Sequence, residues 1–153
     1  MTTGLSKLWL PRVRKFATWS RNEQFILIEA SLFLGLARLA IMVLPFRRIA
    51  PYLGQHMAVS SEAIDQENLT ELRSIARAID TASRHLPWEC KCLTQAMAAR
   101  VMLRRRRIPC TLYLGLAKDQ NRNLQAHAWV RSGRLILTGR NGMEAYTVVA
   151  TFA

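Results

Sequence analysis

At 153 residues, the chain is long enough to bury a hydrophobic core and corresponds most simply to one domain, with room for a helical segment ahead of it. Half of the residues are hydrophobic, which excludes a largely disordered protein. A net charge of +12, from 22 basic and 10 acidic residues, favours partners that carry negative charge: an acidic peptide, an anionic membrane or a nucleic acid.

Cysteine usage indicates a reducing compartment. Three cysteines make a poor disulfide framework, because the count is odd and Cys90 and Cys92 are separated by a single residue. The first residues are basic, but no short apolar run with a small-residue cleavage site follows them, so we expect no signal peptide. The expectation is a cytoplasmic protein.

The N-terminal part of the chain predicts one long helix. Residues 1–19 are basic and aromatic, and the following Ser-Arg-Asn-Glu is a capping box in which Ser20 caps the helix and Glu23 reaches back. The helix is expected over residues 23–44, because Pro45 disfavours helical backbone in the residue before it. A basic connector broken by proline and glycine follows.

The apolar stretch 25–44 of this helix is long enough to span a bilayer. Glu29 and Arg38 interrupt it, and each would cost roughly 2.5–3.5 kcal/mol at mid-bilayer. The two charges lie on opposite sides of a helix, so one cannot readily hide the other. We therefore favour a helix that is buried or faces a partner, and keep peripheral contact with a membrane as the alternative.

Two further helices and four strands are predicted after residue 60. Apolar residues at helical spacing predict a helix over residues 68–84 and another that begins near Cys92 and ends at the arginines 104–107. Four stretches have the pattern of strands: residues 110–117, 125–131, 134–138 and 145–152. This order predicts an α+β fold, in which N-terminal helices precede a nucleophile-bearing helix packed on a small antiparallel sheet.

Cys92 is the first candidate for that nucleophile. At the start of a helix it meets unpaired N–H groups and the positive end of the helix dipole, which favour the thiolate. Pro87 and Trp88 form a non-helical approach, so Cys92 belongs to the first turn. Cys90 lies in the preceding loop without that environment, and Cys110, at a strand start, is expected in the core.

His127 is the candidate base for this thiol. It lies in a strand where Trp129 shares its face, and the alanines that flank it leave space for a peptide. An imidazole presented by a strand close to the helix start can accept the proton of Cys92. His56 and His85 lie in loop or helix-end settings and are weaker candidates.

A third residue, which would fix the tautomer of the imidazole, is harder to assign. No aspartate follows His127, and Asn141 and Glu144 are the candidates downstream of it. An asparagine takes this role in some cysteine proteases. Asp119, in a turn before the histidine, is a further option. The candidate catalytic residues are therefore Cys92 and His127, with Asn141 or Glu144 as the third.

Metal and nucleic-acid binding are both disfavoured. Positions 90 and 92 have C-x-C spacing, which differs from the C-x2-4-C spacing of zinc sites, and no second pair of ligands follows. The arginine run 104–107 lacks the interleaved aromatic residues and the motif of a nucleic-acid site. We expect no metal, no cofactor and no nucleic-acid partner.

These residues resemble the leader peptidase of lasso-peptide biosynthesis in its split form, a family of the transglutaminase-like (papain-like) cysteine protease superfamily. The helix that ends in Leu-Pro-Phe-Arg-Arg, residues 44–48, is similar to the family's N-terminal segment. The other matching blocks are Cys92-Leu93, Leu103-Arg104-Arg105 to Ile108, Leu114-Gly115 and Ala126-His127-Ala128-Trp129-Val130. By this resemblance, residues 1–60 are a basic, helical N-terminal segment and residues 61–153 the transglutaminase-like domain.

The resemblance implies a peptidase that cuts a ribosomally made precursor peptide once, between leader and core. Cys92 would be the nucleophile and His127 the general base and acid. A separate leader-recognition protein would deliver the precursor, because residues 1–60 show no winged-helix pattern, and an ATP-dependent lasso cyclase would close the freed core. The family's triad normally ends in an aspartate on the strand after the histidine, and residues 137–144 contain none.

Three alternatives stay open. A transglutaminase-type acyl transferase or amide ligase would form the same thioester and differ only in whether water or an amine attacks it. A non-catalytic peptide-binding module would use Cys92 as part of its scaffold. A membrane-anchored protein would use the long apolar helix as its anchor.

Overall fold

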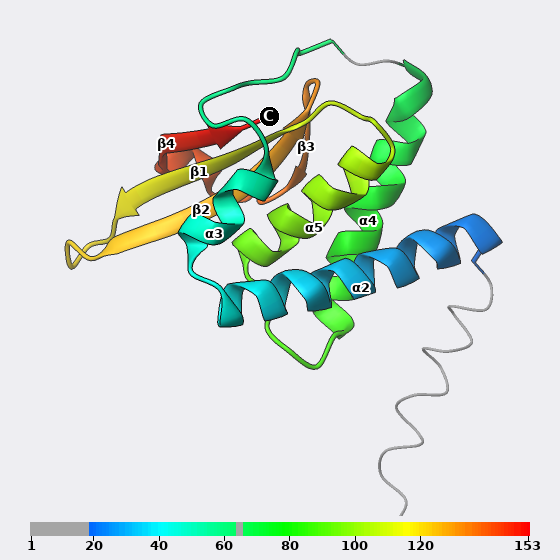
Figure 1. Ribbon diagram of the computed structural model, residues 1–153, viewed down its shortest axis with the longest axis horizontal. Coiled ribbons are helices and arrows are strands. Elements are labelled where there is room, and N and C mark those ends of the chain that lie inside the picture. Colours follow the sequence, from blue (N-terminus) through cyan, green and yellow to red (C-terminus); the bar gives the residue numbers. More distant parts are fainter. Residues whose placement is uncertain (1–18, 64–65) are drawn as a thin grey trace, which may run out of the picture.

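Helices cover one face of a four-stranded sheet in two successive layers (Figure 1). The computed structural model describes residues 19–63 and 66–153, so the basic residues 1–18 lie outside the described part. Helices α4 (Leu69–His85) and α5 (Cys92–Arg105) pack on the sheet. Helix α2 (Arg21–Val43) lies across α4 and α5 on the side away from the sheet, and the short helix α3 (Phe46–Ile49) follows it.

The sheet is antiparallel throughout, with strand order β3-β2-β1-β4. Its strands are β1 (Thr111–Lys118), β2 (Leu124–Ser132), β3 (Leu135–Thr138) and β4 (Thr147–Phe152). The register places Gly115 of β1 opposite His127 of β2. The predicted α+β class, with N-terminal helices before an antiparallel sheet, is confirmed.

The predicted start and end of the long helix are also confirmed. The Ser20 hydroxyl accepts a hydrogen bond from the Glu23 N–H at 3.3 Å, and the Glu23 carboxylate accepts one from the Ser20 N–H at 3.0 Å. Both halves of the capping box are therefore present. At the other end, Leu44 is extended before Pro45, as the constraint on the residue before proline requires.

The last strand starts later than its sequence pattern predicts. The expectation was a strand over residues 145–152, but Met143–Ala145 form a 3-10 turn and β4 begins at Thr147. Gly142 precedes this turn with φ of +78°, a conformation that glycine adopts without steric cost. The turn therefore includes Ala145, the first residue of the predicted strand, and Tyr146 follows it as the cap.

The core is centred on α5, which contacts α2, α4 and the first three strands. Small side chains allow these close approaches, because Ala96, Ala98 and Ala99 are fully buried along α5. Larger residues of the neighbouring helices fill the space around them: Leu34 of α2 and Leu72, Ile75 and Ile79 of α4. The position of α5 is thus set from both of its sides.

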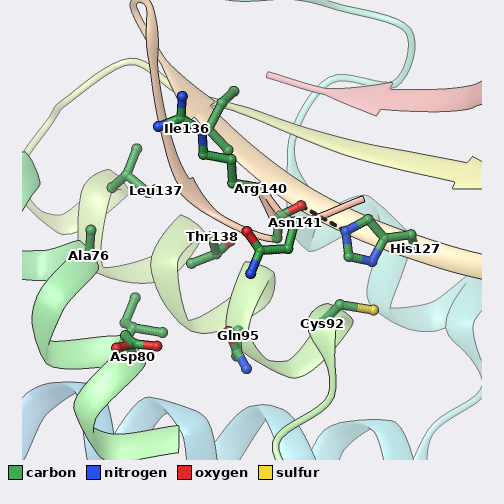
Figure 2. A pocket seen from close by; sticks show the side chains of 12 residues that line it. Ala76, Asp80, Cys92, Gln95, His127, Ile136, Leu137, Thr138, Arg140 and Asn141 are labelled. Atoms are coloured by element: carbon green, nitrogen blue, oxygen red, sulfur yellow. Dashed lines mark hydrogen bonds between the residues drawn. The ribbon is translucent and has the colours of Figure 1, made fainter. Parts of the chain in front are cut away.

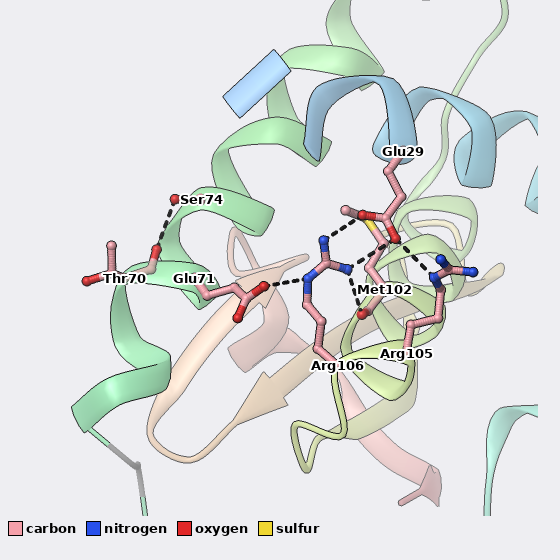
Figure 3. Close-up of polar contacts among 7 residues, drawn as sticks. All are labelled: Glu29, Thr70, Glu71, Ser74, Met102, Arg105 and Arg106. Carbon is pink, nitrogen blue, oxygen red and sulfur yellow. Dashed lines mark hydrogen bonds and ion pairs between the residues drawn. The ribbon is translucent and has the colours of Figure 1, made fainter. Parts of the chain in front are cut away.

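An ion cluster at the end of α5 joins all three long helices (Figure 3). Arg106 donates from Nε to Glu71 of α4 at 2.6 Å and from Nη2 to Glu29 of α2 at 2.6 Å. Its side chain and that of Glu29 are each 20% exposed. The hydrogen bond to Glu29 is the main cause that raises the pKa of Arg106 further above its ordinary value. No pattern in the sequence predicts this cluster.

We expect Arg106→Met to lower the free energy of unfolding by about 2–3 kcal/mol, because it leaves half-buried carboxylates without their partner. Arg105→Met is the matched control: this side chain contacts Glu29 at 3.2 Å but is 65% exposed. Its replacement should cost less than about 1 kcal/mol. Urea unfolding of both variants measures the difference, and equal losses would contradict the assigned role of Arg106.

Candidate active site

Cys92 is the first residue of α5, as the sequence predicts. Lys91 precedes it in extended conformation and makes no side-chain cap, so within the described residues the N-cap side chain leaves the N–H groups of the first turn without an acceptor. Gln95 holds the approach to the helix, because its side-chain amide donates to the Cys90 carbonyl at 2.9 Å. The thiol therefore has a fixed place beside free N–H donors.

Cys92 and His127 line one cleft of about 460 Å³, and each of them is partly exposed (Figure 2). The walls come from α4, the first turn of α5, β2, β3 and the turn after β3. Both charge signs are present in it. Asp80, which pairs with Arg84 at 2.8 Å, lies on the α4 side, and Arg140 lies on the side of the turn.

One hydrogen bond orients the imidazole of His127. Its Nε2 lies 2.7 Å from the carbonyl oxygen of Gly139, the residue directly after β3. A carbonyl oxygen only accepts, so Nε2 must carry the proton of the neutral ring. The other nitrogen, Nδ1, is then an acceptor, and it faces Cys92 across the cleft (Figure 2). This is the tautomer that a base for the thiol needs.

Two aromatic rings pack near the imidazole. The ring centroids of Trp129 and Tyr146 lie 5.8 Å and 5.0 Å from that of His127. Gly115, opposite His127 on β1, makes room for them, because a Cβ there would approach Tyr146 to 2.8 Å and Trp129 to 2.9 Å. Gly115 and Trp129, which both belong to the blocks that match the family, thus both help to position the His127 ring.

The candidates for the third position lie in different places. Asn141 lines the cleft, whereas Glu144 is an exposed residue of the 3-10 turn and does not line it. Neither hydrogen-bonds to His127 among the residues that the structure describes. Asp119 accepts from the N–H groups of Asn121 and Asn123 in the β1–β2 turn, and the bond from Asn123 is the main cause that lowers its pKa.

The Gly139 carbonyl was not foreseen from the sequence. Every residue has a carbonyl group, so only its position after β3 marks this one. Its glycine has a structural reason: φ is +72°, and a Cβ would come within 2.3 Å of the Ala128 oxygen. The sequence signal that was available is the glycine that directly follows the predicted strand at residues 134–138.

The other two cysteines have less suitable surroundings. Cys110 is 2% exposed, and burial raises the pKa of its thiol although the nearby charge of Arg100 opposes this. Burial likewise raises the pKa of Cys90, with the charge of Arg38 opposing. Both thiols stay protonated at neutral pH and are weak nucleophiles there. Within residues 19–63 and 66–153, no group of three or more metal-ligating side chains comes together.

We expect the proton of neutral His127 to lie on Nε2. In Cys92→Ala at alkaline pH, where imidazole rings are neutral, long-range ¹H–¹⁵N correlation spectra distinguish the two tautomers. His85 is an internal control, because its Nδ1 lies 2.6 Å from the Thr81 carbonyl and must carry the proton instead. A His127 ring protonated on Nδ1 would overturn the assignment.

Comparison with known proteins identifies the family to which the chain belongs. No curated protein and no solved structure matches the chain. The family model of the transglutaminase-like superfamily matches residues 40–151, which is most of the sequence. This range includes Cys92, His127, the first three strands and all of β4 except its last residue, Phe152. The division at residue 60 stays a prediction. The chain belongs to the transglutaminase-like superfamily.

Proposed function

We propose that the protein is a cysteine peptidase that removes the leader from a ribosomally made lasso precursor peptide. One observation carries the catalytic part: Cys92, at a helix start, and His127, held in the required tautomer, line the same cleft. Membership of the transglutaminase-like superfamily supports cysteine peptidase or acyl-transfer chemistry. The choice of lasso precursors rests on the sequence blocks around the two residues.

The first half of the reaction follows from the atoms of the cleft. Nδ1 of His127 takes the proton from Sγ of Cys92, and the thiolate attacks the scissile carbonyl carbon. N–H groups of the first turn of α5 stabilise the oxyanion. Nδ1 then returns its proton to the leaving amine, which departs as the new N-terminus of the core. The leader is left as a thioester on Cys92.

Water completes the cycle. His127 takes a proton from it through Nδ1, and the resulting hydroxide attacks the thioester carbonyl. The carbon–sulfur bond breaks, His127 returns its proton to the thiolate, and the leader leaves as a carboxylic acid that loses its proton to solvent. The Gly139 carbonyl keeps Nε2–H in place through both halves, so the ring need not change its orientation.

The surroundings of the cleft suit a peptide substrate. Its volume of about 460 Å³ accommodates a few residues on either side of one bond rather than a whole precursor. A separate leader-recognition protein would therefore supply most of the affinity, and an ATP-dependent cyclase would use the freed core. Such an assembly would work in the cytoplasm.

The same thioester would also support transglutaminase-type acyl transfer, which the superfamily favours equally. The two activities differ in the second nucleophile, water or an amine. Mass spectrometry of the products separates them, because hydrolysis gives two shorter peptides and acyl transfer gives a cross-link.

We expect Cys92→Ala to abolish cleavage of a lasso precursor peptide, assayed with a leader-recognition protein by mass spectrometry. His127→Ala should lower the rate by about 10²–10⁴-fold, the usual contribution of a general base and acid. Matched controls are Cys90→Ala and His85→Ala, which should stay within about threefold of the wild type because neither side chain lines the cleft.

Binding of the precursor by Cys92→Ala, followed by fluorescence anisotropy, should equal that of the wild type. Normal cleavage by either cleft variant would refute the catalytic assignment. Loss of cleavage in the two controls as well would indicate a structural effect instead.

A further inference from the structure

The outer face of α2 is a continuous apolar surface that no described part of the chain covers. Six side chains spaced by three or four residues form it, each between 50% and 73% exposed: Phe25, Ile28, Leu32, Leu36, Leu39 and Val43. The opposite side of the helix, with Ile26, Ala30, Leu34 and Ala37, is buried against α4 and α5. Because water is a poor solvent for such a stripe, its exposure indicates a partner.

Length and composition alone would let α2 cross a membrane, and only 22% of its most apolar stretch is buried. Its attachment to the domain excludes this arrangement in the folded state. The Glu29 carboxylate is held by Arg106 at 2.6 Å, and the buried side packs on α4 and α5. An α2 that stays docked can lie only along a surface, not through it.

The charges around the outer face have one sign. Arg21 precedes it, and Arg47 and Arg48 of α3 lie a few residues after its end; all three are exposed and form no ion pair with a residue that the structure describes. The two acidic residues of α2 make other contacts. Glu23 caps the helix and Glu29 joins the ion cluster. An apolar stripe with basic ends is complementary to an anionic lipid surface.

The same charges disfavour a second copy as the partner. Since both ends of the stripe are basic, pairing two α2 helices in parallel or antiparallel would place arginines beside arginines. The net charge of +12 adds to this repulsion. In contrast, each of these arginines would strengthen binding to an anionic bilayer.

We propose that the outer face of α2 docks the protein on an anionic lipid bilayer. The six apolar side chains enter the boundary between headgroups and acyl chains, while Arg21, Arg47 and Arg48 contact lipid phosphates. Each such arginine strengthens binding by roughly fivefold. This inference does not depend on the proposed peptidase activity.

Co-sedimentation of the full chain with vesicles tests the proposal. We expect binding to vesicles of equal parts phosphatidylcholine and phosphatidylglycerol, and much weaker binding to phosphatidylcholine alone. Leu32→Gln/Leu36→Gln should lower the affinity by about tenfold or more. The matched control is Val59→Gln/Leu124→Gln, which changes two exposed apolar residues outside α2 and should retain binding within about twofold.

Charge is tested separately. Arg47→Gln/Arg48→Gln should weaken binding to the anionic vesicles by roughly 25-fold at low salt, and less as salt is added. Unchanged thermal unfolding would show that these variants stay folded, as expected for side chains that are already exposed. Cys92→Ala should bind vesicles like the wild type, because the cleft does not include α2.

Three results would overturn the proposal. Equal binding of all variants to both kinds of vesicle would show that the outer face is not responsible. Absence of vesicle binding, with a dimer that Leu32→Gln/Leu36→Gln dissociates in sedimentation, would identify a second copy as the occupant. A monomer that does not bind vesicles, but whose binding to a leader-recognition protein is lost in Leu32→Gln/Leu36→Gln, would identify a protein as the occupant. In each case the cleavage assay would still report on the peptidase separately.

Discussion

The burial of α5 is the constraint on which the other features depend. Its alanine-rich faces allow both the sheet and α2 to approach closely, so the axis of the helix cannot shift without opening a cavity. One end of this helix carries Cys92, and Arg106 caps the other end in the ion cluster. The core therefore fixes the position of the Cys92 thiol. The attachment of α2 also depends on α5.

The imidazole is positioned by different means. The pairing of β1 and β2 places His127 opposite Gly115, two aromatic rings limit its tilt, and the Gly139 carbonyl selects the tautomer. A neutral carbonyl orients the ring without adding a negative charge beside it, unlike an aspartate. A stabilising charge for an imidazolium would have to come from elsewhere. The proposed chemistry therefore relies on geometry more than on a charged third residue.

Local signals in the sequence predicted the elements well. The capping box of Ser20 and Glu23 and the stop before Pro45 each act within a few residues, and both agree with the structure. The strand predicted around His127 is also present, although burial does not alternate along it: Ala128, Trp129 and Val130 are all buried. They also placed Cys92 at the first position of its helix. The α+β order follows from these elements.

What the sequence did not predict involves long-range contacts or the backbone. The ion pair of Glu29 and Arg106 joins residues 77 positions apart, and neither residue type marks its partner. The Gly139 carbonyl has no side-chain signature. An almost uniformly apolar helix such as α2 does not reveal which of its sides is covered, so its exposed face emerged only from the fold.

The central claim is that Cys92 is the activated thiol and His127 its base. Its most direct test is the rate of iodoacetamide alkylation of each cysteine as pH is varied, located by mass spectrometry in the wild type and in His127→Ala. At neutral pH, we expect Cys92 to react first and to slow markedly in His127→Ala. Cys90 and Cys110, whose pKa values are raised by burial, should react appreciably only at alkaline pH. If Cys92 reacted no faster than Cys90, or did not respond to the loss of His127, the assignment would be contradicted.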